Sequence, residues 1–184
     1  MKKFINAEGR EISVYDNVLG LSDRQTLLHF LTNSFYKPVG IDTAEWNFKS
    51  HVSMMSCYTR EDLSKSKFLD YLPEEIKQEY ADNLNIGSME NCNINLVTPS
   101  DRFHIHADSS SGAKLTVMYY TTSNWDVEFG GDSIFLDSTG KDIEFYCQYK
   151  TDRLVIFDSS IPHVVRPSTW LAPYYRLSFA MKFL

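Results

Sequence analysis

The second half of the sequence is a series of short β-rich runs separated by turn residues, and this pattern restricts the fold more than any other feature. Turn residues stand at Gly130-Gly131 and at Ser138-Thr139-Gly140. Seven or eight short strands joined by sequential hairpins favour a double-sheet jelly roll over an open sheet. The predicted strands are Asn93–Val97, Phe103–His106, Leu115–Tyr120, Ser133–Leu136, Ile143–Cys147, Leu154–Phe157 and Arg176–Lys182.

The first 90 residues carry mostly helical patterns, after one predicted strand at Ile12–Leu19. Ser22-Asp23 is predicted to cap a helix whose apolar residues recur at helical spacing. A second helical stretch begins near Arg60, and Pro73 opens a further segment that continues to Leu84. The apolar residues of the first helix are Leu27, Leu28, Leu31 and Phe35.

The sequence contains no internal repeat and no linker long enough to separate two domains. Its length of 184 residues fits one ordinary domain. We therefore predict a single, mainly β domain over residues 1–184, with a helix-rich supporting region at 1–90 and a jelly-roll core at 91–184.

Charge and composition exclude several classes of function. A net charge of −6 disfavours nucleic acid as a partner, because nucleic-acid binding depends on Lys and Arg. No apolar run approaches the roughly 18 residues of a membrane span, and no signal-peptide pattern is present, so a cytoplasmic location is expected. Cys57, Cys92 and Cys147 are widely spaced, which indicates reduced thiols and neither a disulfide framework nor a zinc site.

The residues best suited to chemistry are His106 and Asp108, which form an H-x-D motif at the end of a predicted strand. Side chains at positions i and i+2 of a strand share a face, so both could hold one metal ion. The motif alone is common, but His163 follows a later apolar strand and would complete two histidines and one carboxylate. This set is the facial triad of non-haem Fe(II) oxygenases, which leaves three coordination positions open. His104 with His106 also spells the H-x-H of a cupin, but serines stand where a cupin has glutamate.

Arg176 opens the last predicted strand and is the candidate partner for a small anion. A guanidinium matches a carboxylate with two charge-assisted hydrogen bonds, and Ser178, two residues on, would face the same pocket. Tyr120 is a further candidate for a phenolic hydrogen bond. Arg166 and Lys182 are the alternative cations in this part of the chain.

Residues 91–184 resemble the Fe(II)- and 2-oxoglutarate-dependent dioxygenases, and within them the prolyl hydroxylase branch. The resemblance rests on an ordered series of motifs: His106-Ala-Asp108, Met118-Tyr119-Tyr120, Asn124-Trp125-Asp126, Gly130-Gly131-Asp132, Asp152-Arg153-Leu154-Val155-Ile156-Phe157, His163-Val-Val and Arg176-Leu-Ser178. It implies a double-stranded β-helix, Fe(II) held by the two histidines and Asp108, and 2-oxoglutarate bound by Arg176 and Tyr120. The same resemblance implies that Ser178, Met118 and Val165 lie beside the co-substrate.

The resemblance further implies that dioxygen and 2-oxoglutarate are consumed, giving succinate and a hydroxylated substrate, with ascorbate as a reductant in vitro. The expected substrate is a proline within a peptide or protein, entering beside the loop Val165–Tyr175, with Trp46 and Asn47–Ser56 at the rim. A free amino acid or other small molecule is the alternative substrate, and a non-catalytic jelly-roll binding module is the third possibility. The sequence departs from the family at Lys182, where many prolyl hydroxylases have tryptophan, and at Ala113, where a basic residue is common.

Overall fold

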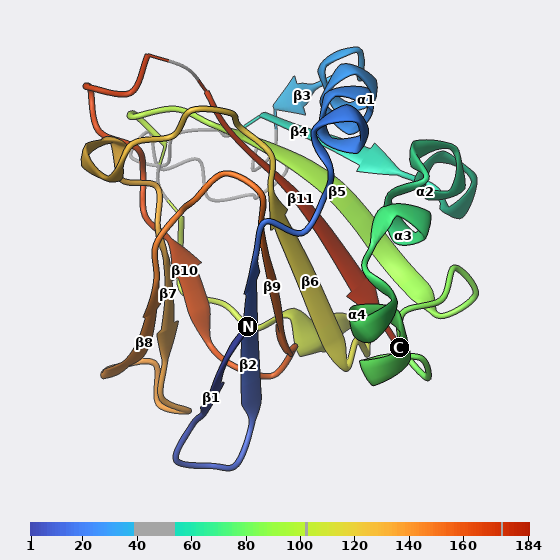
Figure 1. Ribbon diagram of the computed structural model, residues 1–184. Helices are drawn as coiled ribbons and strands as arrows, with labels where there is room; N and C mark the ends of the chain where they lie inside the picture. The colour runs from blue at the N-terminus through green and yellow to red at the C-terminus, as the bar shows by residue number, and fades with distance from the viewer. Residues whose placement is uncertain (39–53, 102, 174) are drawn as a thin grey trace.

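The structure is a computed structural model that describes residues 1–38, 54–101, 103–173 and 175–184 (Figure 1). Two antiparallel sheets form the body of the protein, and their strand orders are β1-β2-β9-β6-β11-β5-β4-β3 and β10-β7-β8. The strands of the larger sheet are β1 (Lys2–Ile5), β2 (Glu11–Asp16), β3 (Lys37–Pro38), β4 (Met54–Tyr58), β5 (Met89–Val97), β6 (Leu115–Tyr120), β9 (Arg153–Asp158) and β11 (Arg176–Phe183). The smaller sheet contains β7 (Ser133–Leu136), β8 (Ile143–Cys147) and β10 (His163–Val165). This arrangement confirms the predicted mainly β jelly roll.

Strand β9 shows why the two sheets pack as they do. Its residues Val155 and Phe157 lie in the apolar core between the sheets, while Leu154 and Ile156 lie in a second core on the outer face of the larger sheet. Since side chains alternate across a strand, a strand covered on both faces reads as a continuous apolar run. The same alternation holds for β6, so these two strands form the rigid centre of the larger sheet.

The helices cover the outer face of the larger sheet, on the right in Figure 1. They are α1 (Leu21–Thr32), α2 (Arg60–Ser66), α3 (Phe68–Tyr71) and α4 (Glu74–Glu79), and two 3-10 turns lie elsewhere, η1 (Asp108–Ser111) and η2 (Val127–Phe129). Phe68 of α3 is fully buried and packs edge-on against Phe179 of β11, with ring centroids 5.4 Å apart. Within the described ranges, no helix has the length and apolar character that a membrane crossing requires.

Several local predictions were wrong. Residues Phe103–His106 do not form a strand, because the segment pairs with a neighbour only at His106, in an isolated bridge to His163. Ser22-Asp23 does not cap α1: Gly20 is the N-cap, and no side chain caps the helix. The helix ends at Thr32, so Phe35 lies beyond it and is 95% exposed. Helix α4 ends at Glu79, before Leu84.

The region before residue 90 also contributes more strand than its helical patterns indicate. Strands β1 to β4 all come from this region and join the larger sheet, where β2 pairs with β9 and β4 pairs with β5. Strand β5 begins at Met89, and it pairs with β4 from the preceding region. The supporting region and the jelly-roll strands are therefore hydrogen-bonded into one sheet.

Candidate metal and co-substrate site

A cavity of about 420 Å³ lies over the inner face of the larger sheet, bordered by β10 of the smaller one. All predicted site residues except Tyr120 line it: His106, Asp108, Met118, His163, Val165, Arg176 and Ser178. Met55 of β4 also lines it, so part of the expected rim reaches the cavity. Trp46 and residues 47–53 of that rim, and Tyr174 of the expected substrate loop, lie outside the described residues.

His106, Asp108 and His163 are brought together by backbone hydrogen bonds between two distant segments. The backbone N–H groups of His106 and His163 each donate to the other's carbonyl, at 3.0 and 2.9 Å. The N–H of Asp108, at the start of η1, donates to the carbonyl of Ser159 at 2.8 Å. One potential ligand atom from each of the three side chains lies within 4.8 Å of the others. The three donor atoms therefore lie close enough together to share one metal ion.

The hydrogen bonds of the two imidazoles fix which nitrogen faces Asp108. Nδ1 of His106 lies 3.0 Å from the carbonyl of His104, and Nδ1 of His163 lies 3.0 Å from the carbonyl of Ile161. A carbonyl only accepts, so each Nδ1 carries the hydrogen and each Nε2 keeps a free lone pair. Both Nε2 atoms lie 3.7 Å from an Asp108 carboxylate oxygen. This outer support of the rings is typical of metal-binding histidines.

Burial and charge keep Asp108 and His163 in the protonation states that a metal needs. Burial among apolar groups lowers the pKa of His163 to about 4, outweighing the nearby Asp108 carboxylate, so the imidazole is neutral at pH 7. Burial alone would raise the pKa of Asp108, but His163, Lys182 and the Thr116 hydroxyl together hold it below its ordinary value. A neutral imidazole and an ionised carboxylate are the forms that coordinate a divalent ion.

The depressed pKa of His163 predicts a pH dependence of stability for the metal-free protein. The unfolded chain takes up this proton near pH 6.5 and the folded chain only near pH 4, so the unfolded state binds more protons between these values. The free energy of unfolding should therefore fall as the pH drops from 6.5 to 4, by up to roughly 3 kcal/mol. Urea unfolding at a series of pH values, with a chelator present, measures this change in the free energy of unfolding. His163→Phe should flatten this slope, whereas His29→Phe at an exposed helical position should leave it unchanged.

Arg176 is a fully buried cation that forms no ion pair with a described acidic side chain. Its Nε donates to the carbonyl of Gly131 at 2.6 Å, and its Nη1 donates to the hydroxyl of Ser178 at 3.0 Å. The guanidinium carbon lies 5.3 Å from the ring centroid of Tyr120 and 4.6 Å from that of Tyr149. Among the described residues, Nη2 has no hydrogen-bond partner, and no Asp or Glu lies within ion-pair distance of the guanidinium. An unpaired buried charge is costly, so this donor fits the carboxylate of a bound anion.

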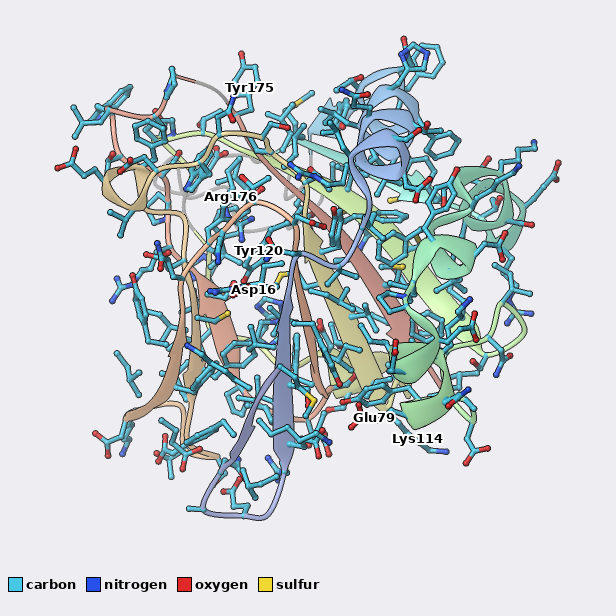
Figure 2. The ribbon with its side chains drawn as sticks, viewed as in Figure 1. Asp16, Glu79, Lys114, Tyr120, Tyr175 and Arg176 are labelled. Carbon is cyan, nitrogen blue, oxygen red and sulfur yellow. The ribbon has the colours of Figure 1, made fainter. Side chains whose placement is uncertain are left out.

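Tyr120 lies close to Arg176 (Figure 2), with its ring against the guanidinium. Its hydroxyl donates to the hydroxyl of Ser133 at 2.8 Å, and its ring stacks on Tyr149 with centroids 4.4 Å apart. The expected hydrogen bond from Tyr120 to the co-substrate stays a prediction. Tyr149 is the second aromatic face against the guanidinium.

Gly131 is the backbone position on which the placement of Arg176 depends. It has φ +81°, and an added Cβ would lie 2.8 Å from Cδ and 3.2 Å from Nε of Arg176. Gly131→Ala should therefore displace the guanidinium and weaken 2-oxoglutarate binding at least tenfold, with metal affinity retained. Gly9 provides the control, because it has φ +79° and nothing within 4 Å of an added Cβ. Gly9→Ala should bind 2-oxoglutarate as the unmodified protein does; equal weakening in both variants would contradict the prediction.

Residues 92–183, half of the chain, match the family described as the 2OG-Fe(II) oxygenase superfamily. The chain belongs to this superfamily. Its members use Fe(II), 2-oxoglutarate and dioxygen, and the His106, Asp108 and His163 cluster provides a matching donor set in this 2OG-Fe(II) oxygenase. No curated protein sequence matches the chain at a significant level.

Solved structures agree with this assignment at the level of the fold. A Pseudomonas putida prolyl-4-hydroxylase is 18% identical with a TM-score of 0.71, over 94% of this chain and 91% of that one. A Trichoplax adhaerens prolyl hydroxylase, solved with a hypoxia inducible factor peptide, is 16% identical with a TM-score of 0.68, over 94% and 83%. The α-ketoglutarate dependent epimerase SnoN from nogalamycin biosynthesis is 12% identical with a TM-score of 0.65, over 94% and 77%. The double-stranded β-helix is thereby confirmed for this oxygenase.

Lys182, a departure from the family and an alternative cation in the sequence, also lines the oxygenase cavity. The ammonium of Lys182 lies 2.8 Å from Oδ1 of Asp108. Lys182 stands six positions after Arg176 on β11, and strand alternation places both on the inner face. The two-residue alternation of side chains along the strand was therefore enough to predict that the Lys182 side chain lies in the site.

Proposed function

We propose that the protein is a hydroxylase in which His106, Asp108 and His163 hold Fe(II) and Arg176 holds the distal carboxylate of 2-oxoglutarate. The observation that carries this proposal is that the three ligand side chains and the unpaired Nη2 of Arg176 belong to one cavity. Iron supplies the activation of dioxygen when it is bound. In the overall reaction a substrate C–H, dioxygen and 2-oxoglutarate become C–OH, succinate and carbon dioxide.

The residues of the chain orient the metal ligands, bind the co-substrate and shield it from water. The carbonyls of His104 and Ile161 hold the two imidazoles in the tautomer that presents Nε2 to the metal. Thr116 donates to Oδ2 of Asp108 at 2.9 Å and fixes the carboxylate. In this proposal Ser178 adds a hydroxyl beside the co-substrate, while Met118 and Val165 give it apolar walls that exclude water.

A peptidyl proline is the substrate that we propose for this site. The likeness to prolyl hydroxylases of two organisms supports it at the level of the fold. Exposed apolar side chains in the loop that follows β10 also support it: Trp170, Leu171 and Tyr175 are 82%, 65% and 59% exposed. Flat aromatic faces suit a pyrrolidine ring and an extended peptide backbone.

A free amino acid or another small molecule is the second candidate substrate. Lys182 and three asparagines make one wall of the cavity polar, which suits a small polar ligand. The epimerase of nogalamycin biosynthesis is an example of this fold with a different reaction. A binding module without catalysis is disfavoured by the complete set of ligand side chains.

The deciding experiment is an aerobic incubation with Fe(II), 2-oxoglutarate and ascorbate. Proline-containing peptides, the same peptides with alanine for proline, and free amino acids are analysed by mass spectrometry for the gain of one oxygen atom, and succinate is measured in parallel. Oxygen gained on the prolyl residue supports the proposal. Oxygen gained only on free amino acids favours the second candidate, and a metal-loaded protein that turns over nothing would be a binding module.

A further inference from the structure

The charges that line the cavity leave one positive charge without a partner after the cofactors bind. Asp108, Arg176 and Lys182 are the charged side chains among the described residues of the lining, and their sum is +1. Fe(II) adds two positive charges and 2-oxoglutarate adds two negative ones, so the sum stays at +1. This count rests on the proposed function. A charge in a partly buried cavity is costly unless it is paired, so the balance favours a substrate with one negative charge.

Lys182 and Arg176 lie too far apart for 2-oxoglutarate to neutralise both. Six residues of an extended strand span about 20 Å, which exceeds the length of a five-carbon dicarboxylate. Asp108 lies near Lys182, whose ammonium is 2.8 Å from Oδ1. The cavity therefore has one cation for the co-substrate at one end and a second cation beside the metal ligands. An ammonium has three N–H donors, and the bond to Asp108 uses one.

A row of asparagines on β5 faces Lys182 across the sheet. Asn91, Asn93 and Asn95 alternate along the strand and all line the cavity. Their partners on β11 are Lys182, Ala180 and Ser178 in that order. The side-chain oxygen of Asn93 is buried and has no hydrogen-bond partner in the described part of the chain. A buried acceptor without a donor is unfavourable, so it fits a ligand that brings an N–H group.

We propose that Lys182 and the asparagine row (Asn91, Asn93 and Asn95) form a substrate subsite that binds a carboxylate, with Asn93 accepting an adjacent N–H. A carboxylate fits better than a phosphate, because a phosphate monoester carries about −1.5 to −2 charges and would overcompensate the single surplus charge. Free amino acids and acidic peptides both offer a carboxylate near an N–H. The subsite therefore selects an acidic substrate and not a neutral one.

Paramagnetic relaxation tests this subsite without turnover. The protein is loaded with Mn(II) and 2-oxoglutarate, oxygen is excluded, and NMR measures the relaxation that Mn(II) causes in the protons of added probes. L-Proline is compared with L-prolinamide, and acetyl-Asp-Pro-Asp-amide with acetyl-Asn-Pro-Asn-amide. We expect the carboxylate member of at least one pair to relax at least five times faster than its amide. The first pair identifies a free amino acid as the source of the carboxylate, and the second identifies a peptide.

Three variants make the result specific to Lys182. Lys182→Met should abolish the preference for the carboxylate, and Lys182→Arg should keep it. Lys65→Met is the matched control, because the Lys65 side chain is 61% exposed on α2, pairs with Glu61 and does not line the cavity. Thermal melting checks that each variant folds. Mn(II) affinity in Lys182→Met should be unchanged or tighter, since a positive charge beside the metal ligand is removed.

Several outcomes would overturn the inference. If Mn(II) relaxes the acids and the amides equally, or relaxes no probe at all, the proposed carboxylate preference is contradicted. Fast relaxation of the acids that persists in Lys182→Met indicates direct binding to the metal. A loss of Mn(II) affinity in Lys182→Met as large as that in Asp108→Ala assigns the lysine to the metal site alone. The peptidyl proline proposal is judged separately by the oxygen gain, so an acid preference that depends on Lys182 stands even where no proline is hydroxylated.

Discussion

Asp108→Ala is expected to weaken Mn(II) binding by roughly 100-fold or more and to abolish succinate formation. Loss of an outer partner of a ligand typically lowers metal affinity about 10–100-fold, and Asp108 is the only negatively charged donor of the cluster. The variant also leaves the Lys182 ammonium as an unbalanced positive charge beside the metal position. Isothermal titration with Mn(II) under anaerobic conditions measures the affinity directly.

Two further variants make this result interpretable. Asp108→Asn keeps the shape of the side chain and should show the same loss of affinity, which separates the charge from packing. Asp142→Ala removes a carboxylate at an exposed position and should bind Mn(II) normally. Retention of full metal affinity in Asp108→Ala would assign the metal to other residues.

Arg176→Met is expected to weaken 2-oxoglutarate binding at least tenfold while Mn(II) affinity is retained. Loss of one partner of a buried hydrogen-bonded charge pair typically costs about 2–5 kcal/mol. Arg176 is fully buried, and its Nη2 has no hydrogen-bond partner among the described residues. A 2-oxoglutarate titration of the Mn(II)-loaded, oxygen-free protein gives the dissociation constant.

The alternative cations are tested in the same titration. Arg166 is exposed and does not line the cavity, so Arg166→Met should bind 2-oxoglutarate normally. Lys182→Met should also bind it with little change, because Lys182 lies beside Asp108 and not beside Ser178. A normal curve for Arg176→Met, with weak binding in either of the other two, would reassign the carboxylate partner.

The sequence predicted those parts of the fold and site that depend on strand periodicity. The apolar run of β9 and the alternation of Arg176 and Ser178 on β11 follow from the period of two and agree with the structure. The proximity of His106 and Asp108 was predicted from the alternation of side chains in a regular strand. That premise was wrong, because His106 forms only an isolated bridge and Asp108 begins a 3-10 turn. The contact with His163 depends on pairing between segments almost 60 residues apart, which no local pattern contains.

Tyr120 illustrates what strand periodicity leaves undetermined. Periodicity places it on the inner face of β6, and it lies in the core between the sheets. There the Arg176 guanidinium and the Tyr149 ring pack against it. Which side chains become neighbours in the core is a property of three-dimensional packing, and neither spacing nor composition contains it.

The position of β11 has a consequence for how the chain folds during synthesis. This strand lies between β5 and β6, and it pairs with β5 at a separation of about 80 residues, from Arg176 to Val97. Until β11 has been synthesised, β5 and β6 each have an open edge. Open strand edges favour misassociation between chains. Pairing over such a long sequence separation is also slow. We therefore expect that nascent chains ending before β11 bind chaperones, and that ribosome-stalled intermediates acquire protease resistance only after Phe183 has left the exit tunnel.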